Sequence, residues 1–324
     1  MKKAAIIGLL SALICLPAAG CACGGKAIHM EVSDLNAVSE SAAETEDVKS
    51  ANPERDKCSV PTKRHRTFFT YKVINGTELK LHFVPPTLDV YEKAPVIVNY
   101  PGGGFASSSI ADYHRILTAE YGDIYDAGIA TVTVQYRTTA EHLANMDQIM
   151  SDCADALRFL SRYSDILGVD AQNIITFGHS AGATAALLMA YAPHSIMDAD
   201  NYYPEYDFRV CGVFAMSPRP RYGNSDNKIL FPQKEMTGKW SAVNYVGNGG
   251  APCKVLMGRE DELIDPSLVA EFKAACDRGG VPCEVVWLEN ADHGYHSVNG
   301  RDVVPDYDKT RATIIPFAKG CVGR

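Results

Sequence analysis

The stretch "ITFGHSAGATAA", residues 175–186, decides how the chain folds, because two kinds of element meet inside it. Its Gly-x-Ser-x-Gly spacing places Ser180 between Gly178 and Gly182, after an apolar run typical of a buried strand and before an alanine-rich run typical of a helix. A sharp turn from strand to helix strains the backbone at its central residue and needs small residues two positions before and after it. The stretch therefore predicts a strand, a tight turn that exposes the Ser180 hydroxyl, and a helix over 181–192.

Predicted strands and helices alternate on both sides of this turn. A hairpin of alternating apolar and polar residues is expected over 67–84, turning at Asn75–Gly76. Periodicity then predicts strands over 95–100, 129–136, 173–178, 210–217, 253–258 and 283–289, and helices over 110–128, 146–168, 181–192, 266–280 and 304–318. This succession predicts an α/β protein with a mostly parallel eight-stranded sheet, helices on both faces and an N-terminal antiparallel hairpin.

The N-terminal part of the chain has the composition of export and linker segments. Residues 1–20 combine two lysines, an apolar run and small residues, which is the layout of a signal peptide, and the "AAGC" ending at Cys21 resembles a bacterial lipobox. Residues 21–62 are rich in serine, alanine and acidic residues and poor in aromatic ones, which predicts a flexible tether. We therefore expect an exported protein, either secreted or held at the bacterial cell envelope by a lipid on Cys21, with its globular domain over 63–324.

Charge and cysteine spacing argue against several classes of partner. The 324 residues carry a net charge of −8, so no global attraction draws the chain to nucleic acid or to anionic lipid. The cysteines are scattered and include no Cys-x-x-Cys pair, which argues against a zinc site, and their spacing does not reveal disulfide pairs. We expect no nucleic-acid partner, no metal, and no membrane contact other than a lipid on Cys21.

A glycine run after another predicted strand supplies candidate hydrogen-bond donors. In "YPGGGF", residues 100–105, three successive glycines leave no Cβ atoms, so main-chain N–H groups can approach a substrate oxygen directly. A flexible loop or a phosphate cradle would use the same residues, but the Lys-Ser/Thr pair of a phosphate-binding Walker loop is absent from this stretch. With Ser180 as a nucleophile, the N–H groups of Gly103, Gly104 and Ala181 are the candidate oxyanion donors.

A serine nucleophile also needs a base that takes its proton. His293 in "NADHGYHS" is the best candidate, because it follows the last predicted strand, at the sheet edge where Ser180 is expected. His296 in the same loop is the alternative. His179 lies beside Ser180, but neighbours at such a turn point apart, so we expect it to shape the pocket.

The acid that orients the base is expected after the strand over 253–258, where three acidic residues are candidates. Glu260 is close to the strand end, where the chain is still leaving the sheet. Asp265 precedes Pro266 and is suited to cap the following helix. Asp261 has no evident structural role, so we take it as the partner of the histidine, with Glu260 and Asp265 as alternatives.

Taken together, these motifs resemble those of a known family. "PGGGF", "VQYRTTAEH", "GHSAG", "SAVNYV", "GREDELI" and "ADHGYH" follow one another in an order that resembles the α/β-hydrolases, over roughly residues 67–318. More narrowly, they resemble the carboxylesterase branch that includes hormone-sensitive-lipase-like esterases and bacterial feruloyl- and acetylxylan-esterase-like proteins. Two positions depart from that pattern: Pro101 replaces the usual histidine before the glycines, and Ala183 replaces a glycine that often follows the serine turn.

The resemblance implies a serine ester hydrolase that works through an acyl-enzyme on Ser180, with His293 as base and Asp261 at the family's Gly-x-x-Asp spacing. It implies no metal or organic cofactor, and short-chain acyl or feruloyl esters of carbohydrates as substrates. The stretch 194–250, rich in tyrosine, proline and asparagine, is expected to be an insert that forms the pocket. An amidase, formamidase or peptidase would use the same three residues, and a non-catalytic binding module on this fold would typically lack one of them.

Overall fold

The computed structural model describes residues 54–61, 65–108, 123–223, 227–247 and 250–323. The predicted signal peptide, Cys21 and the predicted tether up to residue 53 lie outside the described residues, as does most of the helix predicted over 110–128. Within the described part of the chain, every helix is too short or too polar to cross a membrane.

The described end of the predicted tether is packed against the folded domain. The guanidinium of Arg55, in the short 3-10 helix η2 (Arg55–Lys57), lies 2.9 Å from Glu205 Oε2, and the arginine side chain is almost fully buried. The main-chain N–H of Ser59 donates to the carbonyl of Thr70 at 2.8 Å. Ordered contacts therefore begin before residue 62, where composition alone placed the end of the tether.

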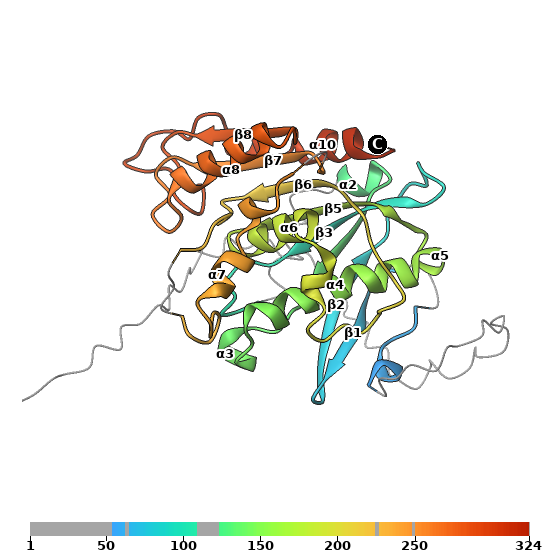
Figure 1. Ribbon diagram of the computed structural model, residues 1–324. Helices are drawn as coiled ribbons and strands as arrows, with labels where there is room; N and C mark the ends of the chain where they lie inside the picture. The colour runs from blue at the N-terminus through green and yellow to red at the C-terminus, as the bar shows by residue number, and fades with distance from the viewer. Residues whose placement is uncertain (1–53, 62–64, 109–122, 224–226, 248–249, 324) are drawn as a thin grey trace, which may run out of the picture. The chain divides into compact units, whose positions relative to one another are not determined.

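An eight-stranded sheet forms the centre of the domain, in the order β1-β2-β4-β3-β5-β6-β7-β8. The strands are β1 (Thr67–Ile74), β2 (Thr77–Val84), β3 (Ala94–Tyr100), β4 (Ala130–Val134), β5 (Val169–His179), β6 (Val210–Met216), β7 (Cys253–Gly258) and β8 (Cys283–Leu288). Strands β1 and β2 form an antiparallel hairpin, β2 pairs antiparallel with β4, and the remaining pairs are parallel. The predicted sheet and its hairpin are confirmed (Figure 1).

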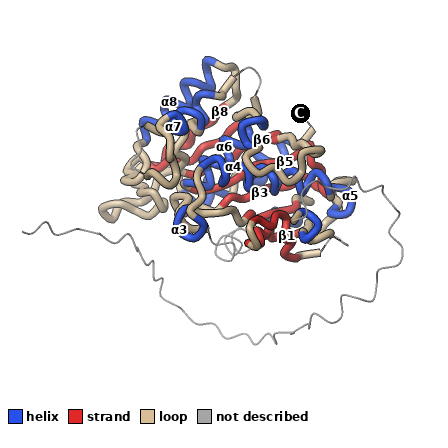
Figure 2. The backbone as a smooth tube through the Cα atoms, turned by 60° about the horizontal axis from the view of Figure 1, so that its bottom comes forward, coloured by secondary structure: helices blue, strands red, loops and turns tan. Residues whose placement is uncertain are grey.

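Helices cover both faces of this sheet, as predicted (Figures 1 and 2). The α-helices are α2 (Asp123–Asp126), α3 (Thr139–His142), α4 (Met146–Arg162), α5 (Ser164–Leu167), α6 (Ala181–Tyr191), α7 (Glu235–Lys239), α8 (Pro266–Arg278), α9 (Tyr307–Arg311) and α10 (Ile314–Cys321), and the other 3-10 turns are η3 (His194–Met197) and η4 (Ala242–Asn244). On β3, Val96 and Val98 join the core formed with α4, α6 and α8, whereas Ile97 joins a second core with α2 and α10. Burial on both faces explains why the central strands are continuous apolar runs.

Three predicted elements differ from the structure. The helix predicted over 146–168 is interrupted at Tyr163, whose φ of −107° and ψ of 20° leave the helical region and separate α4 from α5. The last predicted helix, 304–318, is divided into α9 and α10. The stretch 194–250 is not one insert, because the strand predicted over 210–217 forms β6 within it and pairs with β5 and β7 inside the sheet.

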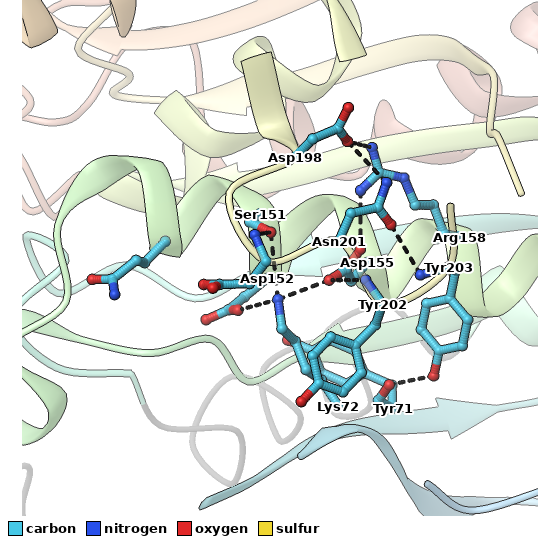
Figure 3. A network of polar contacts seen from close by, with 12 residues as sticks. Tyr71, Lys72, Ser151, Asp152, Asp155, Arg158, Asp198, Asn201, Tyr202 and Tyr203 are labelled. Atoms are coloured by element: carbon cyan, nitrogen blue, oxygen red, sulfur yellow. Dashed lines mark hydrogen bonds and ion pairs between the residues drawn. The ribbon is translucent and has the colours of Figure 1, made fainter. Parts of the chain in front are cut away.

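A buried network of charged groups joins the hairpin to α4 (Figure 3). On β1, Lys72 Nζ lies 2.7 Å from Asp155 Oδ2 and 2.9 Å from Asp152 Oδ1, and none of these three side chains is exposed to solvent. Burial alone would lower the pKa of Lys72, but the two carboxylates outweigh it and hold the pKa above its ordinary value. Lys72 is therefore charged inside the domain.

Two arginines extend this network to the segment after η3. Arg137 Nη2 lies 2.6 Å from Asp200 Oδ2, and Arg158 Nη2 lies 2.7 Å from Asp198 Oδ1. Arg158 also donates through Nη1 to Asp155 on its own helix, at 2.9 Å. The segment just after η3 is thus fastened to α4 by the ion pair between Arg158 and Asp198 (Figure 3).

In a Lys72→Met variant we expect the free energy of unfolding to fall by about 3–5 kcal/mol, because removing one partner of a buried ion pair leaves its carboxylates uncompensated. In the unsubstituted protein Lys72 Nζ lies 5.0 Å from the centroid of the Tyr202 ring. Methionine keeps most of the length of the lysine side chain, so this packing is largely retained. Denaturant unfolding at neutral pH measures the change.

Lys80→Met on β2 is the matched control. Lys80 Nζ also lies near a carboxylate, 3.2 Å from Glu78 Oε2, but 46% of the lysine side chain is exposed. Exposed ion pairs contribute little, so this variant is expected to lose less than about 1 kcal/mol. Equal losses in the two variants would contradict a structural role for the buried network.

Candidate active site

Ser180 lies at a strained turn between β5 and α6. Its backbone has φ 57° and ψ −122°, a conformation that residues with a side chain rarely adopt. A Cβ on Gly178 would overlap the carbonyl group of Gly182, and a Cβ on Gly182 would overlap the carbonyl oxygen of Tyr100. Since only glycine fits at either position, the spacing seen in the sequence is a steric requirement of this turn.

The glycine loop after β3 is folded tightly. Gly103 and Gly104 have φ of +113° and +63°, and a Cβ on Gly103 would overlap Ser107. The carbonyl of Gly103 accepts the main-chain N–H groups of Ala106 and Ser107, at 2.9 and 3.2 Å. The turn therefore has a defined shape that depends on the absence of a side chain at position 103.

Contacts from the segment after β4 brace this loop. The Tyr136 hydroxyl donates to the carbonyl of Pro101, and the N–H of Thr139 donates to the carbonyl of Phe105 at 2.9 Å. The Phe105 ring is buried, with its centroid 6.0 Å from that of Tyr136. These contacts hold the loop without a hydrogen-bonding side chain at position 101.

The glycine loop and the serine turn are in direct contact. Gly182, in the first turn of α6, packs against the main chain of Tyr100 and Pro101 at the end of β3. Ala181 is the first residue of α6, where N–H groups have no carbonyl partner within the helix. The structure therefore places Ala181 close to the loop that carries the other two predicted oxyanion donors.

His293 and Asp261 meet at this edge of the sheet, in the turns after β8 and β7. His293 Nδ1 lies 2.8 Å from Asp261 Oδ2, and the two side chains are only 10% and 0% exposed. Burial raises the pKa of Asp261, but hydrogen bonds from His293 and from the N–H of Ile264 outweigh it and hold the pKa below its ordinary value. The carboxylate is therefore ionised at neutral pH, and because it can only accept, the proton lies on Nδ1 of His293.

The other acidic candidates have partners elsewhere. Glu260 Oε2 accepts a main-chain N–H from the loop after β8 at 3.1 Å. Asp265 accepts an N–H of the first turn of α8 at 2.8 Å, so its predicted role as a helix cap is confirmed. Asp261 does have a local structural role, contrary to our expectation, because its Oδ1 accepts the N–H groups of Leu263 and Ile264 at 2.9 and 2.8 Å.

The two other histidines of the site differ in their surroundings. The His296 side chain is 68% exposed, and its Nδ1 lies 3.3 Å from Asp292 Oδ2. His179 directs its Nε2 toward the main-chain carbonyl of His293, at 2.9 Å. Because His296 is exposed and pairs with Asp292, whereas His293 is buried against Asp261, the geometry favours His293 over His296 as the partner of Asp261.

The hydrogen bonds of the described residues include none between Ser180 Oγ and His293. Such bonds are often long in ligand-free structures.

Comparison with known proteins identifies the family. A model of the BD-FAE family matches residues 84–219, which include the glycine loop and Ser180. The chain is also 31% identical over 241 residues to Esterase LipI of Mycobacterium tuberculosis, an alignment that covers 68% of this chain and 71% of LipI. The chain belongs to the esterases of the α/β-hydrolase fold.

Other similarities of this esterase concern the fold or a shorter stretch. A propionate-bound structure of esterase Est2 from Thermogutta terrifontis has a TM-score of 0.66 at 20% identity, covering 79% of this chain and 92% of that one. Human Carboxylesterase 5A is 29% identical over 118 residues, which are 34% of this chain and 20% of that protein. The fold is thus shared with Est2 along most of the domain, whereas the sequence similarity to Carboxylesterase 5A is confined to part of each chain.

Two contacts of the candidate site in this esterase were not predicted from its sequence. Glu262 Oε2 accepts the main-chain N–H of His293 at 3.2 Å. The main-chain carbonyl of His293 accepts a hydrogen bond from His179 Nε2 at 2.9 Å. The acidic run "REDE" indicated several carboxylates near the histidine loop, but not which main-chain or side-chain atom each of them meets.

Proposed function

We propose that this esterase hydrolyses carboxylic esters through an acyl-enzyme on Ser180, and that its substrates are short-chain acyl or feruloyl esters of carbohydrates. One observation carries the catalytic part of the proposal. Asp261, buried and ionised, holds His293 at 2.8 Å, on the sheet edge where a strained turn presents Ser180. A nucleophile, a base and an acid that orients the base are the three roles of a serine-hydrolase triad, and Ser180, His293 and Asp261 are suited to them.

In this mechanism His293 takes the proton of Ser180 while the serine oxygen bonds to the ester carbonyl carbon. Asp261 keeps the proton of the imidazole on Nδ1, so the lone pair of Nε2 is available as the base. The N–H groups of the glycine loop and of Ala181 stabilise the negative charge on the carbonyl oxygen. His293 then protonates the leaving alcohol, and a water molecule activated by the same histidine releases the acid.

A polar cavity on this edge of the sheet supports a carbohydrate as the alcohol part of the substrate. Its volume is about 490 Å³, and its lining includes Asn75, Arg137, Gln148, Asp200, Asn201 and Tyr202. Arg137 follows β4, which is two strands away from β5, and neighbouring strands lie about 4.8 Å apart. The cavity is therefore offset from the serine turn along the sheet, a place that suits a further sugar of an oligosaccharide rather than the ester group itself.

The N-terminal sequence supports an exported enzyme. Residues 1–20 have the layout of a signal peptide, and Cys21 follows them in a lipobox-like context. An enzyme secreted or held at the bacterial cell envelope would meet glycan esters outside the cell.

Short acyl chains are expected to be cleaved faster than long ones. Each buried methylene contributes about 0.8 kcal/mol of binding, but only where an apolar groove receives it. The segments on either side of β6, 194–209 and 217–250, are rich in tyrosine, proline and asparagine rather than in aliphatic residues. We therefore expect kcat/KM to fall by about tenfold or more from the p-nitrophenyl ester of butyrate to that of decanoate.

A series of p-nitrophenyl acetate, butyrate and decanoate, together with acetylated xylan and methyl ferulate, tests this preference. Faster cleavage of the decanoate would contradict it. Cleavage of the corresponding p-nitroanilide at the rate of the ester would indicate an amidase instead, because the same residues serve both reactions.

A further inference from the structure

The side chain next to the nucleophile is bonded to the loop that carries the base. His179 Nε2 lies 2.9 Å from the main-chain carbonyl oxygen of His293, and the centroids of the two rings are 4.8 Å apart. A carbonyl oxygen can only accept, so His179 donates this bond and its neutral ring carries the proton on Nε2. His179 is thus bonded to the main chain of His293 and not to its ring.

The other hydrogen bonds of His293 lead away from the nucleophile. Its Nδ1 bonds to Asp261, and its main-chain N–H donates to Glu262 Oε2 at 3.2 Å, both in the turn after β7. Two residues further on, the Tyr295 hydroxyl donates to the carbonyl of Leu256 on β7 at 3.1 Å. Among the described residues, the bond from His179 is the one hydrogen bond that ties His293 to the turn between β5 and α6.

His179 supplies this donor without adding a charge. Burial, together with a smaller effect of the neighbouring His293, lowers the pKa of His179 to about 4, although the bond to the carbonyl acts in the opposite direction. At neutral pH its ring is therefore uncharged. A cation at that place would oppose the positive charge that His293 gains when it takes the proton of the nucleophile.

We propose that His179 is a positioning residue, which fixes His293 relative to Ser180 through its hydrogen bond to the His293 main chain. This rests on the proposed function, because it assigns a task in the reaction of Ser180 and His293. The reason is geometric: Asp261 and Glu262 set where His293 lies relative to β7, whereas the nucleophile lies in the turn that follows β5. His179 directly precedes Ser180, so its hydrogen bond fixes the position of His293 relative to the turn that holds the nucleophile.

A His179→Leu variant tests the proposal against His179→Gln. Leucine has no donor, and we expect kcat for p-nitrophenyl acetate to fall by about 10- to 100-fold, since small displacements of reacting groups have effects of this size. KM is expected to stay within about twofold, because His179 is not proposed to touch substrate. Glutamine can direct an amide N–H from a similar position to the same carbonyl, so His179→Gln is expected to recover most of kcat.

His296→Leu is the matched control, because His296 lies in the same loop but is exposed and bonded only within it. Its kcat is expected to stay within about twofold of that of the unsubstituted protein. If His179→Leu keeps full kcat, or if the glutamine variant is no better than the leucine variant, the proposal is overturned. A raised KM with unchanged kcat would also overturn it, because that pattern indicates a lost substrate contact.

A second measurement does not depend on ester turnover. We expect the proton between His293 Nδ1 and Asp261 to give a far-downfield proton NMR resonance, whose exchange with solvent can be followed in the substrate-free protein. We expect faster exchange in His179→Leu and near-normal exchange in His179→Gln, because the leucine variant frees the His293 loop on one side. Unchanged exchange in the leucine variant would overturn the positioning role, whereas failure of the proposed function would appear separately, as a lack of ester hydrolysis by the unsubstituted protein.

Discussion

Replacing Ser180 with alanine is expected to lower kcat for ester hydrolysis by about 10⁶-fold, because the residues of a catalytic triad act as a unit and the loss of the nucleophile removes the covalent route. The fold is expected to survive the change. The strain at φ 57° arises from the Cβ atom, which alanine also has, so the substitution adds no new backbone cost. Hydrolysis of p-nitrophenyl acetate measures the loss, and thermal unfolding with circular dichroism checks the fold.

Ser267→Ala serves as the matched control for Ser180→Ala. Ser267 is also a serine at the start of a helix, in the first turn of α8, but it is exposed and lies beyond the turn that contains Asp261. Its removal is expected to leave turnover unchanged. A folded Ser180→Ala protein with near-normal turnover would contradict both the acyl-enzyme and the choice of nucleophile.

The serine turn could be predicted from sequence because its requirements are local. Gly178 and Gly182 lie within two residues of Ser180, and the structure shows that each would clash with a neighbouring main chain if it carried a Cβ. The strands on either side were predictable for a related reason, since burial on both faces demands uninterrupted apolar runs. The contact between Asp261 and His293 followed from the rule that parallel strands end at a common edge.

The buried charges could not be predicted, because their partners are distant in sequence. Lys72 occupies a polar position in an alternating strand, which indicates a solvent-facing side chain, yet it lies between Asp152 and Asp155 on a helix about eighty residues later. Nothing near Lys72 in the sequence indicates that α4 directs two carboxylates toward β1. The same limit applies to the hydrogen bond from His179, because its acceptor is a main-chain atom more than a hundred residues away.

Replacing Asp261 with asparagine is expected to lower kcat by about 10⁴-fold with little loss of stability. Asparagine keeps Oδ1, which accepts the N–H groups of Leu263 and Ile264, so the turn after β7 retains these bonds. The amide N–H₂ group then takes the place of Oδ2 and faces Nδ1 of His293 as a donor. Nδ1 of the imidazole must then accept this hydrogen bond and be unprotonated. The ring proton therefore moves to Nε2, and Ser180 loses the base that it needs.

Asp265→Asn and Glu260→Gln are the controls for Asp261→Asn, since both change a carboxylate to an amide within four residues of it. Asparagine caps helices about as well as aspartate, so Asp265→Asn is expected to change neither turnover nor the free energy of unfolding. Glu260→Gln keeps an oxygen that can accept the N–H of Ala291 and is also expected to remain active. An inactive Asp265→Asn beside an active Asp261→Asn would show that the acid was assigned to the wrong residue. If all three variants keep full turnover, His293 does not need a carboxylate partner in this esterase, and the hydrogen bond at 2.8 Å has only a structural role.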